Sequence, residues 1–255
     1  TLPEYFSTRF GGRRIRCLLA VVYLIIYIFT KVSVNLYAGA LFLQLAFNFN
    51  LYLAIFGILM VTALFTVVGG LTSVMYTDTM MSIVMLAGGT VLSAIALKEI
   101  HGFHGLYERY LNAIPNSSLL LTNATRNTIQ CGLPQKKAFQ MLRGMSDSYI
   151  PWLVFFLGHT PNTIWYWCSD QMMVQRVLSA KSLSHAKGGT LLTGFLKITP
   201  LFLMVLVGMA SRALYPNTVG CVNSTLCREY CGNPRGCSNI AYPTIALGLL
   251  PSGMK

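Results

Sequence analysis

Five long apolar stretches constrain the fold of this chain more than any other feature of its sequence. A helix needs about 20 mostly apolar residues to cross the hydrocarbon core of a bilayer. The stretches that meet this requirement are Cys17–Phe47, Leu51–Val68, Leu71–Leu97, Pro151–Val174 and Gly189–Ser211. Only 10% of the residues are charged, against about a quarter in a typical soluble domain, which excludes an ordinary cytosolic enzyme, a disordered tail and a coiled coil. We therefore expect an all-α, polytopic membrane protein with about five transmembrane helices.

The basic residues indicate the orientation of these helices. Lys and Arg near helix ends favour the cytoplasm, and they form two clusters, Arg9, Arg13, Arg14 and Arg16, then Arg176, Lys181 and Lys187. Four of the five expected crossings separate the two clusters, which places both clusters on one side of the membrane and the two long loops on the other. The expected segments are a cytoplasmic segment 1–16, three helices in 17–97, an extracellular loop 98–150, a broken helix 151–175, a cytoplasmic loop 176–188, a helix 189–211 and an extracellular loop 212–255.

The two long loops carry residues typical of an extracellular face. All N-x-S/T sequons lie there, at Asn116, Asn123 and Asn223, and each accepts a glycan only outside the cytosol. Five cysteines lie there too: Cys131, Cys221, Cys227, Cys231 and Cys237. The last four are separated by six, four and six positions, whereas zinc sites use C-x2-C-like pairs, so an oxidising exterior favours disulfides over a metal site.

Polar residues inside the apolar stretches are candidate functional positions. A charge in the membrane costs roughly 2.5–3.5 kcal/mol on insertion scales, so it usually faces a cavity or a partner. Lys31 and Asn35, one helical turn apart, either make an interhelical contact or line a cavity. Lys197 either reaches the cytoplasmic surface or faces a cavity, and its depth favours the cavity. Asp78 and Asp170 lie near predicted cytoplasmic helix ends and either bind a cation or pair with a basic neighbour; for Asp170 we favour local pairing.

The fourth stretch holds the most informative motif. Pro161, within Gly158–Asn162, removes a backbone donor and predicts a break or a kink in the helix. Broken helices in transporters place substrate near the bilayer midplane. The segment Trp165–Gln171 follows directly, and sets aromatic rings beside hydroxyl, carboxylate and amide groups. An interfacial belt of Trp and Tyr is the alternative, but a belt needs none of those polar neighbours. Rings that stack on C–H faces, beside groups that exchange hydrogen bonds with hydroxyls, predict a site for a pyranose or cyclitol.

One long run and several shorter segments form a specific set of motifs. They are Trp165–Gly189, Thr1–Tyr5, Arg9–Gly12, Tyr27–Lys31, Tyr76–Asp78 and Gly236–Pro243. Together they resemble the sodium/glucose cotransporter family of the sodium:solute symporters, over essentially the whole chain. The resemblance implies uptake of glucose or a related polyol by alternating access in the plasma membrane, on part of an inverted-repeat fold like that of LeuT. It implies Na⁺ as the co-transported ion and no further cofactor.

The same resemblance implies roles for individual residues. The implied sugar contacts are Thr163, Tyr166, Trp167 and Lys197. Asp78 matches an aspartate of the intracellular cation path, and Asn35, where the family usually has Asp, is the second position considered for that path. The implied disulfide pairs are Cys221 with Cys227 and Cys231 with Cys237, while Cys131 needs a partner outside this chain.

Several functional hypotheses remain at this point. A sodium-coupled symporter of glucose or a related sugar leads, and a myo-inositol symporter is the alternative, because Gly158, Thr160 and Pro161 resemble that branch. The residue at Asn35 keeps a sugar-gated cation conductance or glucose sensor open, and a membrane-anchored structural protein is the third possibility. Neither a Walker-type loop nor a G-x-S-x-G elbow occurs, so we do not expect an enzyme. Because the chain begins at Thr1, we expect an internal piece of a protein whose further helices precede and follow it.

Overall fold

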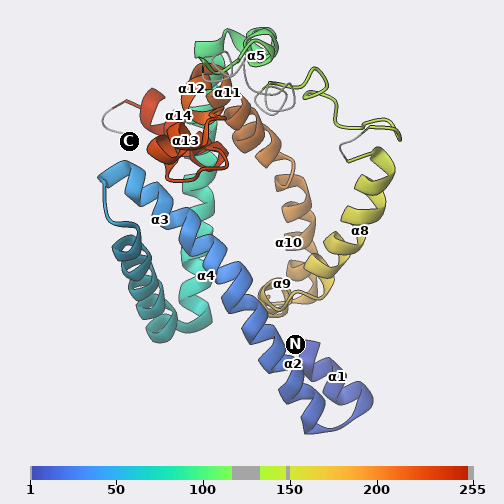
Figure 1. Ribbon diagram of the computed structural model, residues 1–255. Coiled ribbons are helices and arrows are strands. Elements are labelled where there is room, and N and C mark those ends of the chain that lie inside the picture. Colours follow the sequence, from blue (N-terminus) through green and yellow to red (C-terminus); the bar gives the residue numbers. More distant parts are fainter. Residues whose placement is uncertain (1, 117–132, 148–149, 252–255) are drawn as a thin grey trace. The chain divides into compact units, whose positions relative to one another are not determined.

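A computed structural model describes residues 2–116, 133–147 and 150–251, and every regular element in those residues is a helix (Figure 1). The all-α prediction is confirmed. The chain forms two compact units: the first consists of Thr1–Ala38 with Gln140–Lys197, and the second of Gly39–Phe139 with Ile198–Lys255. Each unit therefore combines an early and a late part of the sequence.

The early part of the first unit is a short helix followed by a long apolar one. Its elements are α1 (Leu2–Phe10), α2 (Arg13–Ile26), the π-helical turn η1 (Tyr27–Val32) and α3 (Ser33–Phe47), which continues into the second unit. Gly11 and Gly12 have φ values of 74° and 86°, which glycine adopts without steric cost, and they separate α1 from α2. From Arg13 onward the helix is continuous, and the sequence did not predict the π turn within it.

The late part of the first unit contains the broken helix. Its elements are α8 (Trp152–Cys168), α9 (Gln171–Leu178) and α10 (Leu183–Leu196). Of the two alternatives predicted at Pro161, a break is wrong, because α8 continues through this residue and ends at Cys168. A proline inside a helix removes one backbone donor and crowds the preceding turn, and helices in membranes accommodate it. By contrast, Asp170 starts a new helix, since its Oδ1 accepts a 3.0 Å hydrogen bond from the backbone N–H of Met172 and caps α9.

The longest helical element of the second unit is α4 (Leu51–Ile100), which has one internal interruption. Gly70 has φ 56° and ψ −155°, a conformation that is not helical and that is essentially restricted to glycine. This residue lies between two of the predicted apolar stretches. At the start of α4 the side chain of Asn50 accepts a 3.0 Å hydrogen bond from the backbone N–H of Tyr52, which caps the helix.

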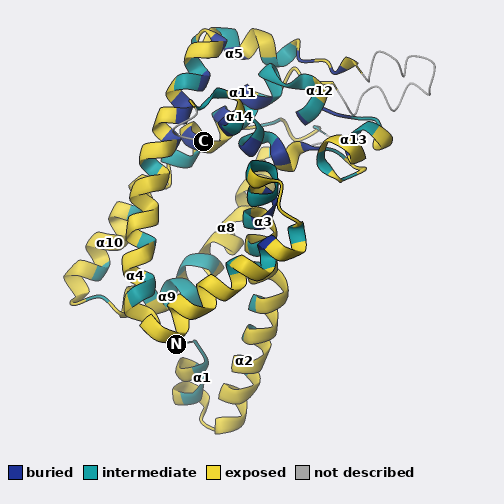
Figure 2. Ribbon diagram, turned by 90° about the vertical axis from the view of Figure 1, so that its left-hand side faces the viewer, coloured by how far each residue is buried: buried dark blue, intermediate teal, exposed yellow. Residues whose placement is uncertain are grey.

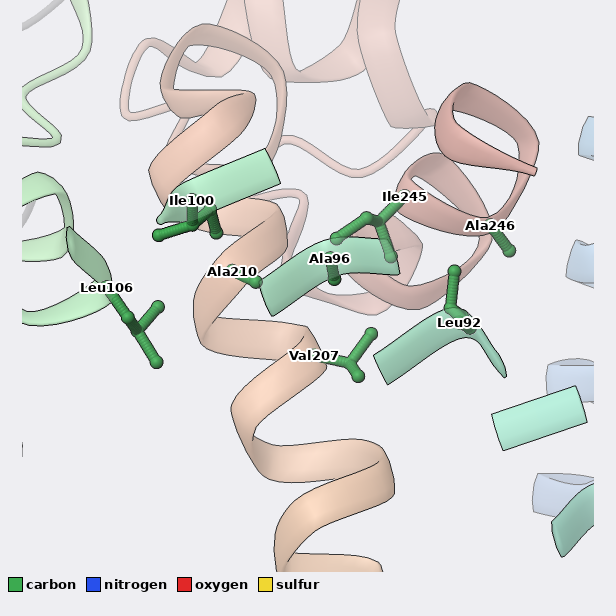
Figure 3. Close-up of a cluster of buried hydrophobic side chains, with 8 residues drawn as sticks. All are labelled: Leu92, Ala96, Ile100, Leu106, Val207, Ala210, Ile245 and Ala246. Carbon is green, nitrogen blue, oxygen red and sulfur yellow. The ribbon is translucent and has the colours of Figure 1, made fainter. Parts of the chain in front are cut away.

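A buried apolar cluster joins four helices of the second unit. The remaining elements of this unit are α5 (Gly102–Leu111), the π-helical η3 (Leu201–Val205), α11 (Leu206–Leu214), α12 (Pro216–Val219), α13 (Ser224–Cys231), the 3₁₀ turn η4 (Ser238–Ile240) and α14 (Ala241–Leu249). Figure 3 shows the cluster, to which α4, α5, α11 and α14 contribute Leu92, Ala96, Ile100, Leu106, Val207, Ala210, Ile245 and Ala246. Alanine at three of these positions lets the helix backbones approach closely. A 2.5 Å hydrogen bond from Ser211 Oγ to the carbonyl of Ala241 adds a polar contact between α11 and the start of α14.

Two cysteine pairs stabilise the segment that precedes α14. The structure pairs Cys221 with Cys227 and Cys231 with Cys237, and the Cα atoms are 5.6 Å apart in each pair. Leu41 of α3 packs against this segment together with Ile240. This pairing is the one that the family resemblance implies. The sulfur atoms of Cys221, Cys227 and Cys237 are close enough together to bind a metal ion, but all three belong to these disulfides.

Three helices in the described residues are long and apolar enough to cross a membrane. They are Arg13–Phe47, Leu51–Ile100 and Leu183–Leu214. In Figure 2 their surfaces are mostly exposed, as expected for helices whose neighbours are lipid or further helices. The fourth predicted crossing rests on α8, which has 17 residues and is about 26 Å long. The chain is therefore part of a multi-pass membrane protein.

Candidate functional site

The predicted solute contacts of the fourth stretch lie near the end of α8. The ring centroids of Tyr166 and Trp167 are 5.5 Å apart with an interplanar angle of 89°, an edge-to-face arrangement. Both side chains are half-buried. Thr163 is exposed one turn earlier on the same helical face, and its Oγ1 donates a 2.7 Å hydrogen bond to the carbonyl of His159. The helix thus presents two perpendicular rings and a nearby hydroxyl.

Lys197 brings a cation to these rings from the C-terminal end of α10. Its Nζ lies 5.5 Å from the ring centroid of Trp167 and 5.8 Å from that of Tyr166, both within the range of about 6 Å for a cation–π contact. Across residues 2–116, 133–147 and 150–251, no carboxylate lies within ion-pair distance of this ammonium. The structure therefore brings together three of the four predicted solute contacts, and the ammonium can donate hydrogen bonds to another molecule.

A second cation, Lys31, lies beside the same aromatic segment. Its ammonium forms an ion pair with Oδ2 of Asp170, which is 139 positions later in the chain and fully buried. The Tyr27 hydroxyl donates a 2.5 Å hydrogen bond to Oδ1 of the same carboxylate. The Lys31 ammonium also lies 4.7 Å from the ring centroid of Tyr27 and 5.3 Å from those of Trp165 and Tyr166. This cluster connects the π turn η1 to the break between α8 and α9.

The sequence identified these charges but not their pairing. For Lys31 an interhelical contact was one of two predicted alternatives, and the structure shows such a contact. For Asp170 we predicted a basic partner nearby in the sequence, whereas the structure supplies a distant one. Two lysines and two carboxylates in apolar stretches allow several pairings, and only the packing of the helices determines which one forms. Trp165, which contacts Lys31, was noted only as part of the aromatic run.

The two residues predicted for the cation path lie in different units. Asn35 is exposed on α3, one turn after Lys31. Asp78 is half-buried on α4, in the part of this helix that follows Gly70. Their roles stay predictions.

The predicted glycosylation sites fall partly within the described residues. Asn116 is exposed, and its backbone N–H donates a 2.8 Å hydrogen bond to the side chain of Asn217. Asn223 caps α13, because its Oδ1 accepts hydrogen bonds of 3.0 and 2.6 Å from the backbone N–H and hydroxyl of Thr225. These bonds use the side-chain oxygen and leave the nitrogen, to which a glycan is joined, available. Asn123 and Cys131 lie outside the described residues.

The aromatic cluster has the chemistry that a many-hydroxyl solute requires. Ring faces contact the C–H faces of such a solute, and an ammonium donates hydrogen bonds to its hydroxyl oxygens. Pockets that bind small molecules combine apolar walls with a few placed polar groups. Tyr166, Trp167 and Lys197 supply both kinds of group within one compact unit.

Comparison with known proteins gives an independent indication of function. The sequence model of the sodium:solute symporter family matches residues 1–255. The chain is 49% identical to the sodium/myo-inositol cotransporter of Bos taurus, with 100% of the chain and 36% of that protein aligned. It is 49% identical to the sodium/myo-inositol cotransporter 2 of Bos taurus and 48% identical to the sodium/myo-inositol cotransporter of Homo sapiens, covering 37% and 36% of them. The chain thus spans about a third of the length of these relatives.

Proposed function

Because this chain belongs to the sodium:solute symporter family, as its motifs predict, we propose that the full-length protein couples Na⁺ entry to the uptake of a cyclic polyol or sugar across the plasma membrane. The chain supplies the part of the solute site that α8 and α10 form. Helices that precede and follow it in the full-length protein complete an inverted-repeat transporter like LeuT. Na⁺ is a transported ion in this proposal, and transport requires no resident cofactor.

One observation carries the assignment of the site. The Lys197 ammonium lies over the rings of both Tyr166 and Trp167. A cation held by two perpendicular rings is fixed in direction without a carboxylate that would compete for its hydrogens. Such an ammonium can donate to solute hydroxyls, and the ring beside it can support the C–H face of the same solute. Thr163 extends the polar edge of the site on the same face of α8.

The solute we propose first is myo-inositol, with glucose as the second. The similar proteins named above are sodium/myo-inositol cotransporters. The two solutes share the stacking faces and hydroxyls that this cluster fits, so the cluster itself does not choose between them. For the cation we propose that Asp78, which carries a charge, belongs to the intracellular cation path, and that Asn35, which carries none, is a second candidate position for it.

Asn35 also supports a second candidate, a sugar-gated cation conductance. An amide in place of a carboxylate weakens the attraction of a cation to this position. Such a protein passes Na⁺ current when solute binds but accumulates no solute. The two functions therefore differ in a measurable quantity.

The test is uptake and current in cells that express the full-length protein. Labelled myo-inositol and glucose are offered separately, with Na⁺ or with choline as the external cation, and current is recorded under voltage clamp. The proposal predicts saturable accumulation that requires Na⁺ and is accompanied by inward current. Current without accumulation would establish the conductance instead, and neither current nor accumulation would overturn both functions.

A further inference from the structure

We propose that Lys31 and Asp170 are positioning residues of the solute site, which hold the Tyr166 ring in place for solute binding. The inference rests on the proposed function. Neither residue is among the predicted solute contacts; within the described residues Lys31 contacts Asp170 and the rings of Tyr27, Trp165 and Tyr166. Their effect on the solute is exerted through Tyr166.

Burial of Asp170 favours the Lys31–Asp170 ion pair. The Asp170 side chain is fully buried, and a buried carboxylate is tolerated only when its oxygens are paired. Its oxygens accept hydrogen bonds from Lys31, from the Tyr27 hydroxyl and from the backbone N–H of Met172. Removal of one partner leaves an uncompensated charge, which is strongly unfavourable inside a membrane protein.

The pair connects two irregular points of the backbone. Tyr27 and Lys31 both belong to the π turn η1, and such turns are rare and frequent at functional sites. Asp170 lies between the two helices: α8 ends at Cys168, and Asp170 is the N-cap of α9, which begins at Gln171. Four positions separate Asp170 from Tyr166, so the ion pair fixes the helix end that carries this ring to the first long helix.

The Tyr166 ring contacts two ammonium groups, which differ in whether they are free to bind a solute. Lys31 lies 5.3 Å from its ring centroid and is neutralised by Asp170. Lys197 lies 5.8 Å from the same centroid and has no carboxylate partner in the part of the chain that the structure describes. Lys31 therefore serves to hold the ring, and Lys197 is left to meet the solute.

The variants test separately the charge of Asp170, its role as the cap of α9 and the contact of Lys31 with the Tyr166 ring. Asp170→Asn removes the charge but keeps a good helix cap. The double variant Lys31→Met with Asp170→Asn leaves no unpaired charge, so it tests positioning without the cost of a buried ion. Tyr27→Phe removes one hydroxyl and keeps the ring, and Lys31→Arg keeps the cation. Lys187→Met is the matched control, since Lys187 is exposed on α10 and has no contact with this cluster.

The experiment is Na⁺-dependent uptake of myo-inositol by the full-length protein, with the amount at the cell surface measured by biotinylation. We expect the double variant to reach the surface with its KM raised on the order of tenfold, the fold-change expected when a desolvated cation–π contact is lost. Asp170→Asn keeps the Lys31 cation but removes its partner, so it should raise KM less than the double variant, and so should Tyr27→Phe. Lys31→Arg and Lys187→Met should keep the wild-type KM. A purely structural role would lower the surface amount and leave KM unchanged.

The outcomes distinguish this inference from the proposed function. An unchanged KM in the double variant and in Tyr27→Phe, while wild-type protein accumulates solute, overturns the positioning role alone. If the double variant is scarce at the surface, Tyr27→Phe decides, because it changes a single oxygen atom. Absence of saturable uptake by wild-type protein overturns the proposed function and this inference with it.

Discussion

Replacement of Trp167 by alanine is the most informative single change in the site. It removes the edge-to-face contact with Tyr166 at 5.5 Å and the contact of the Lys197 ammonium with the indole, also at 5.5 Å. An aromatic pair and a cation–π contact are each worth about 1 kcal/mol, so the change removes about 2 kcal/mol of organisation around the ammonium. Because 1.4 kcal/mol corresponds to a factor of ten, KM for the solute should rise about 30-fold.

The assay is Na⁺-dependent myo-inositol uptake by full-length protein, with rates divided by the amount of protein at the surface. Trp167→Phe keeps an aromatic face and should raise KM much less than Trp167→Ala. Trp152→Ala is a matched control, because Trp152 lies on the same helix, is 43% exposed and contacts Phe156 rather than the site. An unchanged KM in Trp167→Ala, or an equal effect in Trp152→Ala, would refute the reasoning.

Three further predictions concern the backbone and the loops. Gly70→Ala should destabilise the purified protein by about 1–2 kcal/mol in a thermal unfolding assay, because φ is 56° at this residue. Gly57→Ala is the control, since Gly57 lies in the same helix with open space around it and its replacement should not destabilise the protein. Equal unfolding midpoints of the two variants would contradict this prediction. Cys231→Ser should lower the free energy of unfolding by about 2 kcal/mol, because it removes the disulfide with Cys237. Non-reducing peptide mapping of the wild-type protein should recover Cys231 joined to Cys237, and a different partner would refute this pairing. Asn223→Asp should remove one glycan, seen as a gel shift, while it keeps the cap of α13; an unchanged mobility would show that this site carries none.

The sequence predicts the long apolar helices of this chain, because long apolar runs and glycine pairs act locally. It did not predict the shorter helices α1, α5, α12, α13 and α14, which lie in segments expected to be loops or a terminal cytoplasmic segment. Gly70 interrupts α4 at the pair that separates two apolar stretches. The position of the break in the fourth stretch was predicted less well. Pro161 is a strong local signal, but membrane helices accommodate proline, and the break falls where Asp170 caps the next helix.

Pairings between distant residues are the part that the sequence could not supply. The ion pair of Lys31 with Asp170 depends on how helices far apart in the sequence pack, and nothing near either residue encodes the choice. The aromatic segment was easier to single out as a candidate site, because Tyr166 and Trp167 adjoin polar groups in an apolar run. The assignment of Lys197 to the same candidate site followed from the family resemblance and not from spacing, whereas its place over the two rings comes from the structure. The π turn η1 has no sequence signal that we could identify.

The central claim is that Tyr166, Trp167 and Lys197 face a water-filled space in which a cyclic polyol binds. The most direct measurement is an experimental structure of the full-length protein in a lipid nanodisc, with Na⁺ and myo-inositol present. The account predicts solute density against the indole of Trp167, with a hydroxyl in hydrogen-bond range of the Lys197 ammonium. Density for lipid acyl chains against both side chains, with the solute bound elsewhere, would contradict it.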